Sequence, residues 1–514
     1  MENNEKKVLL QISNLKQYFP VGKNRFVKAN DGISIDIYEG ETFGLVGESG
    51  CGKSTLGRSI LQLYKQTDGR TMYFGRSIDE VAPKYARDTF RTLTKRRELM
   101  KTTKEKYEAF KAEYDKKTEQ EQYAMNGQLV HLRKEANDAM LDVTTLIGGL
   151  IVAPDLKPVE KVFLEEYNIS KKLRKAEGAR ANLKLNVDDA AFALKKAEKA
   201  GKSTDSAKAK LEKATAKLEA CENNIQSIHD QIQVVLDKIA EMRKQYCNEP
   251  GYDEYEAHHS NGIDLARLTY SEMRGLRSDL QLIFQDPYSS LNSRMTVGQI
   301  VGEGMLAHKY FRRNDDRMKE EIIRVMEECG LAPYFLHRYP HQFSGGQRQR
   351  IGIARSLALN PKFVVCDEAV SALDVSIQAQ IINLLQDLKE KQNLTYLFIT
   401  HDLSVVKYIS DRIGVMYLGN MVEMAPSDDM FAHPLHPYTE ALLNAIPTTD
   451  EKQEGGPEVL EGDIPSPVNP PKGCKFHTRC KYCTEICKQV VPQMEEVRPN
   501  HFVACHHILE HNKD

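Results

Sequence analysis

The stretch GESGCGKST, at residues 47–55, decides the fold of this chain. It fits the pattern G-x-x-x-x-G-K-[ST], the phosphate-binding P-loop. The apolar run 42–46 before it predicts a buried strand, and 56–63 after it predicts a helix. The glycines let backbone N–H groups close around phosphate oxygens, and the helix N-terminus adds its positive end. The stretch therefore predicts a nucleotide-binding α/β domain.

The same loop supplies the predicted nucleotide ligands. The ammonium of Lys53 would reach the β- and γ-phosphates, and the hydroxyl of Ser54 would bind Mg²⁺. The predicted nucleotide-binding residues of the loop are Gly47, Glu48, Ser49, Gly50, Cys51, Gly52, Lys53, Ser54 and Thr55.

The bulk composition limits the possible functions. The chain has 514 residues, 41% of them hydrophobic, and a formal net charge of −2. It is long enough for two or three domains, and no charge bias points to nucleic acid. No apolar run approaches the roughly 20 residues of a transmembrane helix. The start, MENNEKKVLLQ, lacks a signal-peptide core, so we expect a cytoplasmic chain with reduced cysteines.

Polar residues follow three further apolar runs. Asp367 and Glu368 close FVVCDE, where an aspartate can hold Mg²⁺ and a glutamate can polarise the attacking water. Gln285 follows LQLIF and could bind Mg²⁺ or that water. His401 follows YLFIT and could contact the γ-phosphate. Each residue alone is ordinary at a strand end, but the P-loop upstream makes the set a predicted catalytic site.

The stretch HQFSGGQRQRIGIAR, at 341–355, contains a second anion site. Ser344, Gly345, Gly346 and Gln347 come immediately before an amphipathic helix, whose free N–H groups and dipole attract phosphate. Two phosphate-binding devices in one chain predict a dimer. Each ATP would lie between the P-loop of one chain and the SGGQ of the other.

These motifs occur in the order of ATP-binding-cassette ATPases. The resemblance rests on GESGCGKST, Gln285, SGGQ, VVCDE, SALD at 371–374 and His401. It implies an α/β fold with a RecA-like core, an antiparallel β subdomain and a helical signature subdomain. It also implies ATP-driven closure of a head-to-tail dimer, with Asp374 in the D-loop. Phe19, in preference to Tyr18, matches the aromatic residue that stacks on adenine.

A narrower resemblance covers about residues 6–75 and 262–508. FQDPYSSLNSRMTVGQIV, CDEAVSALDVSIQAQIINLL, HPLHPYTEALLNAIP and GCKFHTRC…CHH resemble ATPase subunits of oligopeptide and dipeptide importers, the OppF/DppF type. The resemblance implies a second, related ATPase, two transmembrane permease subunits and an extracellular solute-binding protein. It places the chain peripherally at the cytoplasmic face of the membrane. Related importers carry nickel or other solutes, so the solute stays open.

Five of the ten cysteines lie between 474 and 505, spaced C-x5-C-x2-C-x3-C-x17-C. In a reducing compartment, four thiolates suit Zn²⁺ or an iron–sulfur cluster. The importer resemblance implies a [4Fe–4S] cluster at Cys474, Cys480, Cys487 and Cys505, with Cys483 outside the pattern. The alternatives are bare thiols, or zinc with help from His477, His501, His506 or His507.

The segment 76–261 is rich in Lys, Glu, Ala and Gln, and predicts long helices. Two heptad-like series predict an antiparallel coiled-coil hairpin with arms at about 165–199 and 205–246. The series are Ile169, Leu173, Ala176, Arg180, Leu183, Val187, Ala190, Leu194, Ala197, and Ala207, Leu211, Ala214, Leu218, Cys221, Ile225, Ile228, Ile232, Val235. In the predicted hairpin, the numbers of two residues that face each other across the arms sum to 404 or 405. Leu183 is therefore predicted to lie opposite Cys221. Arg180 either extends out of the seam on its aliphatic stem, or the neighbouring Ala179 takes its place in the seam.

The predicted turn of the hairpin is 200–205, with Gly201 as helix terminator and Ser203 or Thr204 as cap. The alternative is two single helices packed on the ATPase domain. The hairpin carries no phosphate or metal motif, so we expect a docking or regulatory arm. The predicted domains are 6–75 with 262–447 (helical subdomain about 292–360), the insertion 76–261, and 448–514 as linker and cysteine-rich region.

Two other functions compete with the importer ATPase. A coiled-coil ATPase acting on DNA or chromosomes also combines these motifs with long helices. Against it, the insertion precedes Gln285 and its tip lacks a C-x-x-C hook. A nucleotide sensor without turnover is disfavoured by the intact Glu368 and His401.

Overall fold

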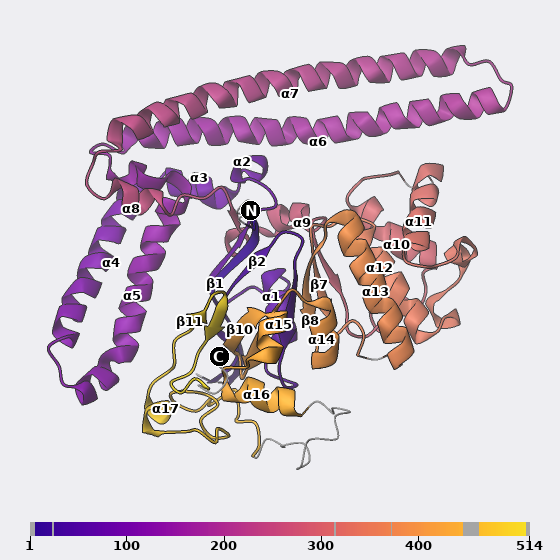
Figure 1. Cartoon of the computed structure of the whole chain (residues 1–514). Coiled ribbons are helices and arrows are strands. Elements are labelled where there is room, and N and C mark those ends of the chain that lie inside the picture. The colour runs from indigo at the N-terminus through magenta and orange to yellow at the C-terminus, as the bar shows by residue number, and fades with distance from the viewer. Residues whose placement is uncertain (1–5, 23–24, 313–314, 372, 446–461, 510–514) are drawn as a thin grey trace. The chain divides into compact units, whose positions relative to one another are not determined.

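The computed structural model describes residues 6–22, 25–312, 315–371, 373–445 and 462–509, so that 448–461 of the predicted linker lie outside it. The chain forms two compact units (Figure 1). The first contains the described parts of 1–75, 264–266 and 273–514. The second contains 76–263 and 267–272.

The main sheet of the first unit has the strand order β11-β12-β10-β9-β3-β8-β7-β6. Strand β3 lies between β8 and β9 and is parallel to both. Every residue of β3, β7 and β8 is buried, as expected for parallel strands covered on both faces. The parallel strands are β3 Thr42–Val46, β6 Leu280–Ile283, β7 Phe363–Asp367, β8 Thr395–Ile399 and β9 Arg412–Tyr417. Ligand sites form beyond the carboxyl ends of such strands.

Strands from the far C-terminus extend this sheet. Strand β10 (Asn420–Pro426) pairs antiparallel with β9 and forms a β-hairpin with it. Strand β12 (His501–Val503) adds to β10, and β11 (Glu495–Arg498) adds to β12. The cysteine-rich region therefore contributes two strands to the ATPase sheet. Strands of three or four residues carry too little alternation to be predicted from sequence.

A second, antiparallel sheet has the order β2-β1-β4-β5. Its strands are β1 Val8–Gly22, β2 Arg25–Tyr38, β4 Asp68–Tyr73 and β5 Ile263–Asp264. In β2, the alternating residues Ile33, Ile35 and Ile37 are all buried and form the apolar face of the strand. The strands β1 and β2 pair antiparallel up to Gly22 and Arg25.

Helices of the first unit flank the main sheet. The P-loop helix α1 (Lys53–Ile60) begins three residues earlier than predicted and ends before Gln62, whose φ is 52°. The signature region contains α10 (Val297–Ala307), α11 (Asp316–Glu328) and α12 (Gly345–Leu357). The other helices are α13 Val375–Gln392, α14 Leu403–Ile409, α15 Ser427–Ala432, α16 Pro437–Asn444 and α17 Glu485–Gln489, and α9 Tyr270–Leu276 spans the boundary between the units.

The second unit is helical, with two long helix pairs (Figure 1). Its helices are α2 Ile78–Val81, α3 Lys84–Phe90, α4 Leu93–Tyr114, α5 Glu119–Ile147, α6 Lys157–Lys199, α7 Asp205–Tyr246 and α8 Tyr252–Glu256. Among all described helices, none combines the length and apolar character that a membrane span requires.

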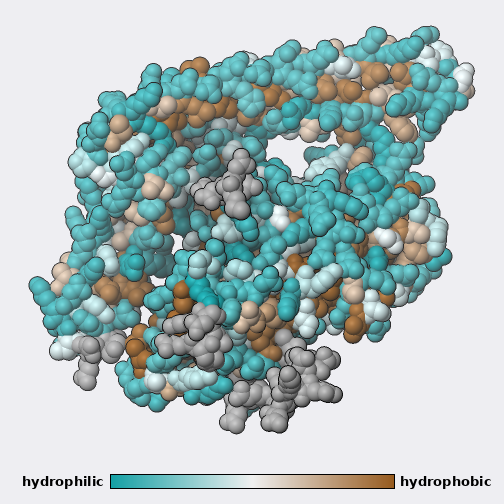
Figure 2. All heavy atoms as spheres, in the orientation of Figure 1, coloured by the Kyte–Doolittle hydropathy of each residue, from teal (hydrophilic) through white to brown (hydrophobic). Residues whose placement is uncertain are grey.

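The helices α6 and α7 lie side by side (Figure 1), and a band of hydrophobic side chains follows them in Figure 2. Every residue of the two predicted series is buried or half-buried. Between the helices, Gly201 has a φ of 63°, the left-handed conformation of a helix terminator. Arg180 keeps its half-buried position and donates to Glu177 at 2.7 Å, while Ala179 is exposed.

Lys238 pairs with Glu165 across the two helices at 3.1 Å, close to the predicted register, but the contact of Cys221 differs from the prediction. Its thiol donates to the carbonyl oxygen of Ala176 at 3.7 Å, seven residues before the predicted partner Leu183. Ala176 has only a methyl group, so a sulfur atom can approach the α6 backbone there. A bulkier leucine holds a neighbouring helix farther away.

Candidate nucleotide-binding site

The P-loop connects β3 to α1 through a tight turn. Gly47, Gly50 and Gly52 have φ values of 147°, 80° and 104°, a region that favours glycine. A Cβ atom at Gly52 would lie 2.1 Å from the carbonyl oxygen of Ala29, and one at Gly47 would lie 2.2 Å from that of Met416. The glycines at both positions are therefore required for the close packing of the loop.

The side chain of Lys53 lies inside this loop. It is buried, and its Nζ donates to the carbonyl oxygens of Gly47 at 2.7 Å and Glu48 at 3.0 Å. Cys51 is also buried, and burial raises the pKa of its thiol. The loop thus holds one positive charge at its centre, where a phosphate would bind, and keeps Cys51 as a neutral packing residue.

Asp367 ends β7 and is completely buried. One carboxylate oxygen, Oδ2, accepts a hydrogen bond from Arg58 at 3.1 Å. The other, Oδ1, is buried without a hydrogen-bond partner. A buried, unpartnered carboxylate oxygen is costly by itself, so this atom is suited to a cation or to its bound water.

Glu368 brings two other predicted catalytic residues together. Its φ of 47° places a non-glycine residue in the left-handed region. Its Oε2 accepts from Gln285 Nε2 at 2.6 Å, and its Oε1 lies 3.7 Å from His401 Nδ1. The backbone N–H of Glu368 donates to the carbonyl oxygen of Ile399 at 2.9 Å. Three strand ends, far apart in sequence, therefore present one polar cluster.

A cavity of about 470 Å³ connects the P-loop to this cluster. It is lined by Phe19, Val27, Lys28, Ala29, Ser49, Gly50, Cys51, Gly52, Lys53, Ser54, Thr55, Gln285, Glu368, His401, Leu418, Gly419 and Pro467. Phe19 lines it and packs edge-to-face on Tyr64, with ring centroids 5.4 Å apart. Tyr18 is not among the lining residues, and its hydroxyl donates to Asp31. Of the two aromatic candidates, Phe19 is thus the one beside the cavity.

The predicted Mg²⁺ ligands fit a magnesium ion in kind. Ser54 and Gln285 line the cavity, and Asp367 supplies the buried oxygen without a partner. Hydroxyl, amide and carboxylate oxygens are the ligands that Mg²⁺ takes together with substrate phosphates.

The SGGQ residues form the start of helix α12. Ser344 caps it: its hydroxyl accepts from the N–H of Gln347 at 3.4 Å, and the Gln347 side chain accepts from the N–H of Ser344 at 3.1 Å. Ser344 is exposed, and none of Ser344 to Gln347 lines the P-loop cavity. Asp374 is also exposed and caps α13 through its carbonyl oxygen. The structure therefore gathers the other motifs in one site and leaves these two outside it.

The sequence did not predict the contribution of the C-terminal region to this site. Arg479 forms a two-pronged ion pair with Glu48 of the P-loop, and Pro467 lines the cavity. The carbonyl oxygen of Pro467 accepts from the N–H of Lys28 at 3.2 Å. Arg479 lies between the first two cysteines of the C-x5-C-x2-C-x3-C-x17-C pattern. No periodic pattern in the sequence around it indicates a functional role.

The cysteines Cys474, Cys480, Cys487 and Cys505 all line one small pocket, with His477, His506 and His507. Burial raises the pKa of Cys480 to about 11 and that of Cys505 to about 12. Among the described residues, however, no group of three or more His, Cys, Asp or Glu side chains is arranged to hold a metal ion. The residue types suit a metal site, but their positions do not form one.

These features together define an ATP-binding-cassette ATPase. They are the P-loop, the aspartate–glutamate pair, the neighbouring glutamine and histidine, and the capped SGGQ helix. Comparison with known families agrees. The family described as "ABC transporter" matches residues 30–149 and 242–371. The family "Oligopeptide/dipeptide transporter, C-terminal region" matches residues 422–487.

Individual relatives cover most of the chain or its ATPase parts. The putative oligopeptide transport ATP-binding protein YkfD of Bacillus subtilis is 35% identical over 500 residues, 97% of this chain and 95% of that protein. AppF of the same organism, an oligopeptide transport ATP-binding protein, is 52% identical over 48% of this chain and 75% of its own length. OppF of Salmonella typhimurium is 51% identical over 48% and 73%. The chain therefore belongs to the family of ABC transporter ATP-binding proteins.

Proposed function

We propose that this chain is the ATP-hydrolysing subunit of an ABC importer for oligopeptides or dipeptides. The observation that carries the ATPase role is the contact of Glu368 with Gln285 and His401 beside the P-loop cavity. The solute class rests on the match of residues 422–487 and on the peptide transport named for the relatives.

In this proposal each residue of the cavity has one task in hydrolysis. Lys53 neutralises the β- and γ-phosphates, and Phe19 stacks on adenine. Ser54, Gln285 and Asp367 would hold Mg²⁺, which screens the phosphate charge. Glu368 orients the attacking water and accepts its proton, while His401 contacts the γ-phosphate. The contacts among Gln285, Glu368 and His401 keep these side chains in place before nucleotide binds.

The proposal includes an ATPase dimer. At the start of α12, Ser344 is exposed and Gly345 to Gln347 are half-buried, all outside the cavity, so their N–H groups are available to contact ATP held by another subunit. Asp374 is exposed as well and would meet the same partner. We take that partner to be a second, related ATPase, which makes the pair a heterodimer.

The further proposed partners are two transmembrane permease subunits and, indirectly, an extracellular solute-binding protein. The chain would then act peripherally at the cytoplasmic face of the membrane and bind no nucleic acid. Co-purification from membranes tests this proposal: the tagged chain should bring two permease subunits and a second ATPase. Recovery with nucleic acid and without membrane subunits would favour the DNA-acting alternative instead.

For the insertion, we propose that α6 and α7 form a coiled-coil arm with a docking or regulatory role. The buried and half-buried series along both helices support the coil. None of the residues 76–261 lines the ATP cavity, which supports a role outside catalysis.

A further inference from the structure

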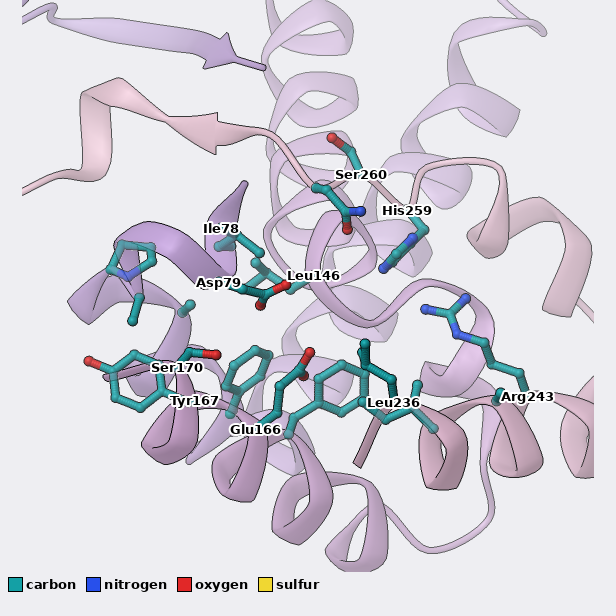
Figure 3. Close-up of a pocket in the computed structure, with 18 residues that line it drawn as sticks. Ile78, Asp79, Leu146, Glu166, Tyr167, Ser170, Leu236, Arg243, His259 and Ser260 are labelled. Atoms are coloured by element: carbon teal, nitrogen blue, oxygen red, sulfur yellow. The ribbon is translucent and has the colours of Figure 1, made fainter. Parts of the chain in front are cut away.

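The helical unit contains a cavity of about 350 Å³ that the ATPase does not use (Figure 3). Helices α2, α3, α5, α6 and α7 and the segment 259–261 line it, all within the same unit. Its apolar lining includes Phe90, Leu146, Phe163, Leu236 and Ile239. The volume is in the range of small-molecule sites in proteins.

Two carboxyl groups face this apolar space. Glu166, on α6, is only 8% exposed, and Asp79, on α2, is half-buried. In Figure 3 both side chains point into the same part of the cavity. Within the part of the chain that the structure describes, neither carboxyl group forms a hydrogen bond or an ion pair. Burial, and then the charge of Asp79, raises the pKa of Glu166 to about 8.

The other polar groups of the lining offset this only in part: the charge of Arg243 lowers the pKa of Glu166 but is outweighed by burial. Arg243, on α7, approaches from the opposite side (Figure 3), but its guanidinium is already paired with Glu256. Burial lowers the pKa of His259 to about 4, so its ring is neutral at pH 7. The hydroxyl of Ser170 is buried without a hydrogen-bond partner. A buried polar group without a partner is costly, and a ligand that supplies donors removes that cost.

We propose that this cavity binds a small organic amine. Its ammonium group would lie between Asp79 and Glu166, and its apolar body would pack among Phe90, Phe163 and Leu236. An anion would gain no ion pair from either carboxyl group. A bare metal ion fits poorly because much of the lining is apolar, and no group of three ligating side chains is arranged there among the described residues.

Binding has a proton balance that can be measured. The amine enters as an ammonium ion, and the carboxylic acid of Glu166 ionises beside it and releases its proton to the buffer. The other titratable groups that line the cavity are Asp79, Arg243, His259 and Tyr167. At pH 7 the ring of His259 stays neutral and the guanidinium of Arg243 stays paired, so Glu166 is the group expected to release the proton.

The test is calorimetric titration of the full chain with phenethylamine at pH 7, in two buffers of different ionisation enthalpy. We expect binding with proton release, and at least tenfold weaker binding of the neutral analogue 2-phenylethanol. Glu166→Gln should weaken phenethylamine binding at least tenfold. Glu165→Gln is the matched control. Glu165 is the neighbouring residue that pairs with Lys238, and its side chain is 42% exposed. The affinity of this variant for phenethylamine should be unchanged.

Absence of binding, equal affinity for the alcohol, or full affinity of the Glu166→Gln chain would each overturn the proposal. If Glu166→Gln does not fold, Asp79→Asn provides the same comparison from the opposite wall of the cavity. That variant should lose at least tenfold in affinity as well, and unchanged affinity would again overturn the site.

Discussion

The guanidinium of Arg479 holds the carboxylate of Glu48 through two hydrogen bonds, of 2.7 and 3.0 Å. Glu48 belongs to the P-loop, and Arg479 lies in the cysteine-rich region. The Arg479 side chain is only 5% exposed. The N–H of Glu48 also donates to the Tyr438 hydroxyl at 2.9 Å. The C-terminal part of the chain therefore supports the phosphate-binding loop directly.

We expect Arg479→Met to weaken ATP binding roughly tenfold. The unpaired Glu48 carboxylate would then repel the phosphates, and one such charge costs on the order of 1–2 kcal/mol at an effective dielectric constant near 20. Equilibrium titration with a fluorescent ATP analogue measures the Kd. Adding Glu48→Gln to the variant should recover most of the affinity, while Lys481→Met, at a more exposed ion pair, should leave it unchanged. An unchanged Kd for Arg479→Met would show that the ion pair has no influence on the nucleotide.

Glu368→Gln should lower ATP turnover by roughly 10²-fold or more and leave ATP binding intact. The amide keeps the size of the side chain but cannot accept a proton from water, and it should trap the closed dimer. Steady-state phosphate release, with the partner subunit present, measures the loss. Glu327→Gln, on the exposed face of α11, is the control. Near-normal hydrolysis in Glu368→Gln would remove this residue from the proposed role.

The stability of the first unit should decrease above neutral pH through His501. This ring is buried between Glu423, at 2.7 Å, and Asp429, at 2.6 Å. Burial alone would lower the pKa of His501, but the hydrogen bonds and charges of both carboxylates outweigh it and raise the pKa. Since the unfolded value is about 6.5, the charged ring stabilises the fold below that pH. This contribution is lost as the pH rises through the folded pKa.

Urea unfolding midpoints measured from about pH 7.5 upward should therefore fall, and His501→Gln should flatten the decrease. His436, whose pKa burial lowers to about 3, still binds protons in the unfolded state near pH 6.5, which opposes the effect of His501, so the comparison is made above about pH 7.5, where His436 is neutral in both states. His341→Gln, at an exposed position, should retain the wild-type pH dependence. The same slope in wild type and His501→Gln would contradict the prediction.

Joining Gly75 directly to Gly262 should leave a folded ATPase that binds ATP. The main sheet and every residue lining the nucleotide cavity lie outside the deleted segment. Circular dichroism and nucleotide titration of the shortened chain check this expectation. If the deletion abolishes nucleotide binding, the insertion is part of the ATPase core and not an accessory arm.

For the cysteine-rich region, we propose a structural [4Fe–4S] cluster at Cys474, Cys480, Cys487 and Cys505. The four thiols line one pocket, which supports this proposal. Purified without oxygen, the chain should be brown and contain iron, and Cys480→Ser should lose both. Cys247→Ser, at an exposed cysteine of the other unit, is the control. A colourless protein with stoichiometric zinc would identify a zinc site, and a metal-free protein would leave bare thiols.

The catalytic cluster was predictable because parallel strands are apolar runs, and each motif residue follows one. Together with the P-loop upstream, that rule predicted that Gln285, Glu368 and His401 belong to one catalytic site. The pair of Arg479 and Glu48 was not predictable, since the two residues are 431 positions apart and neither lies in a periodic pattern. The packing of α4 against α5 could not be predicted for another reason. Helix α4 buries only Leu93 and Met100, too few residues to mark a packed face in the sequence.

The three residues of β12 have a consequence for solubility. Without them, β10 would be the outermost strand of the sheet, with its N–H and C=O groups open to pairing with another chain. Beyond β12, the outermost strand is β11, which is four residues long and exposes Glu495 and Glu496. A short, charged border of this kind resists strand addition by neighbouring molecules. The C-terminal region thus also protects the ATPase against edge-to-edge aggregation, and chains truncated before it should be prone to self-association.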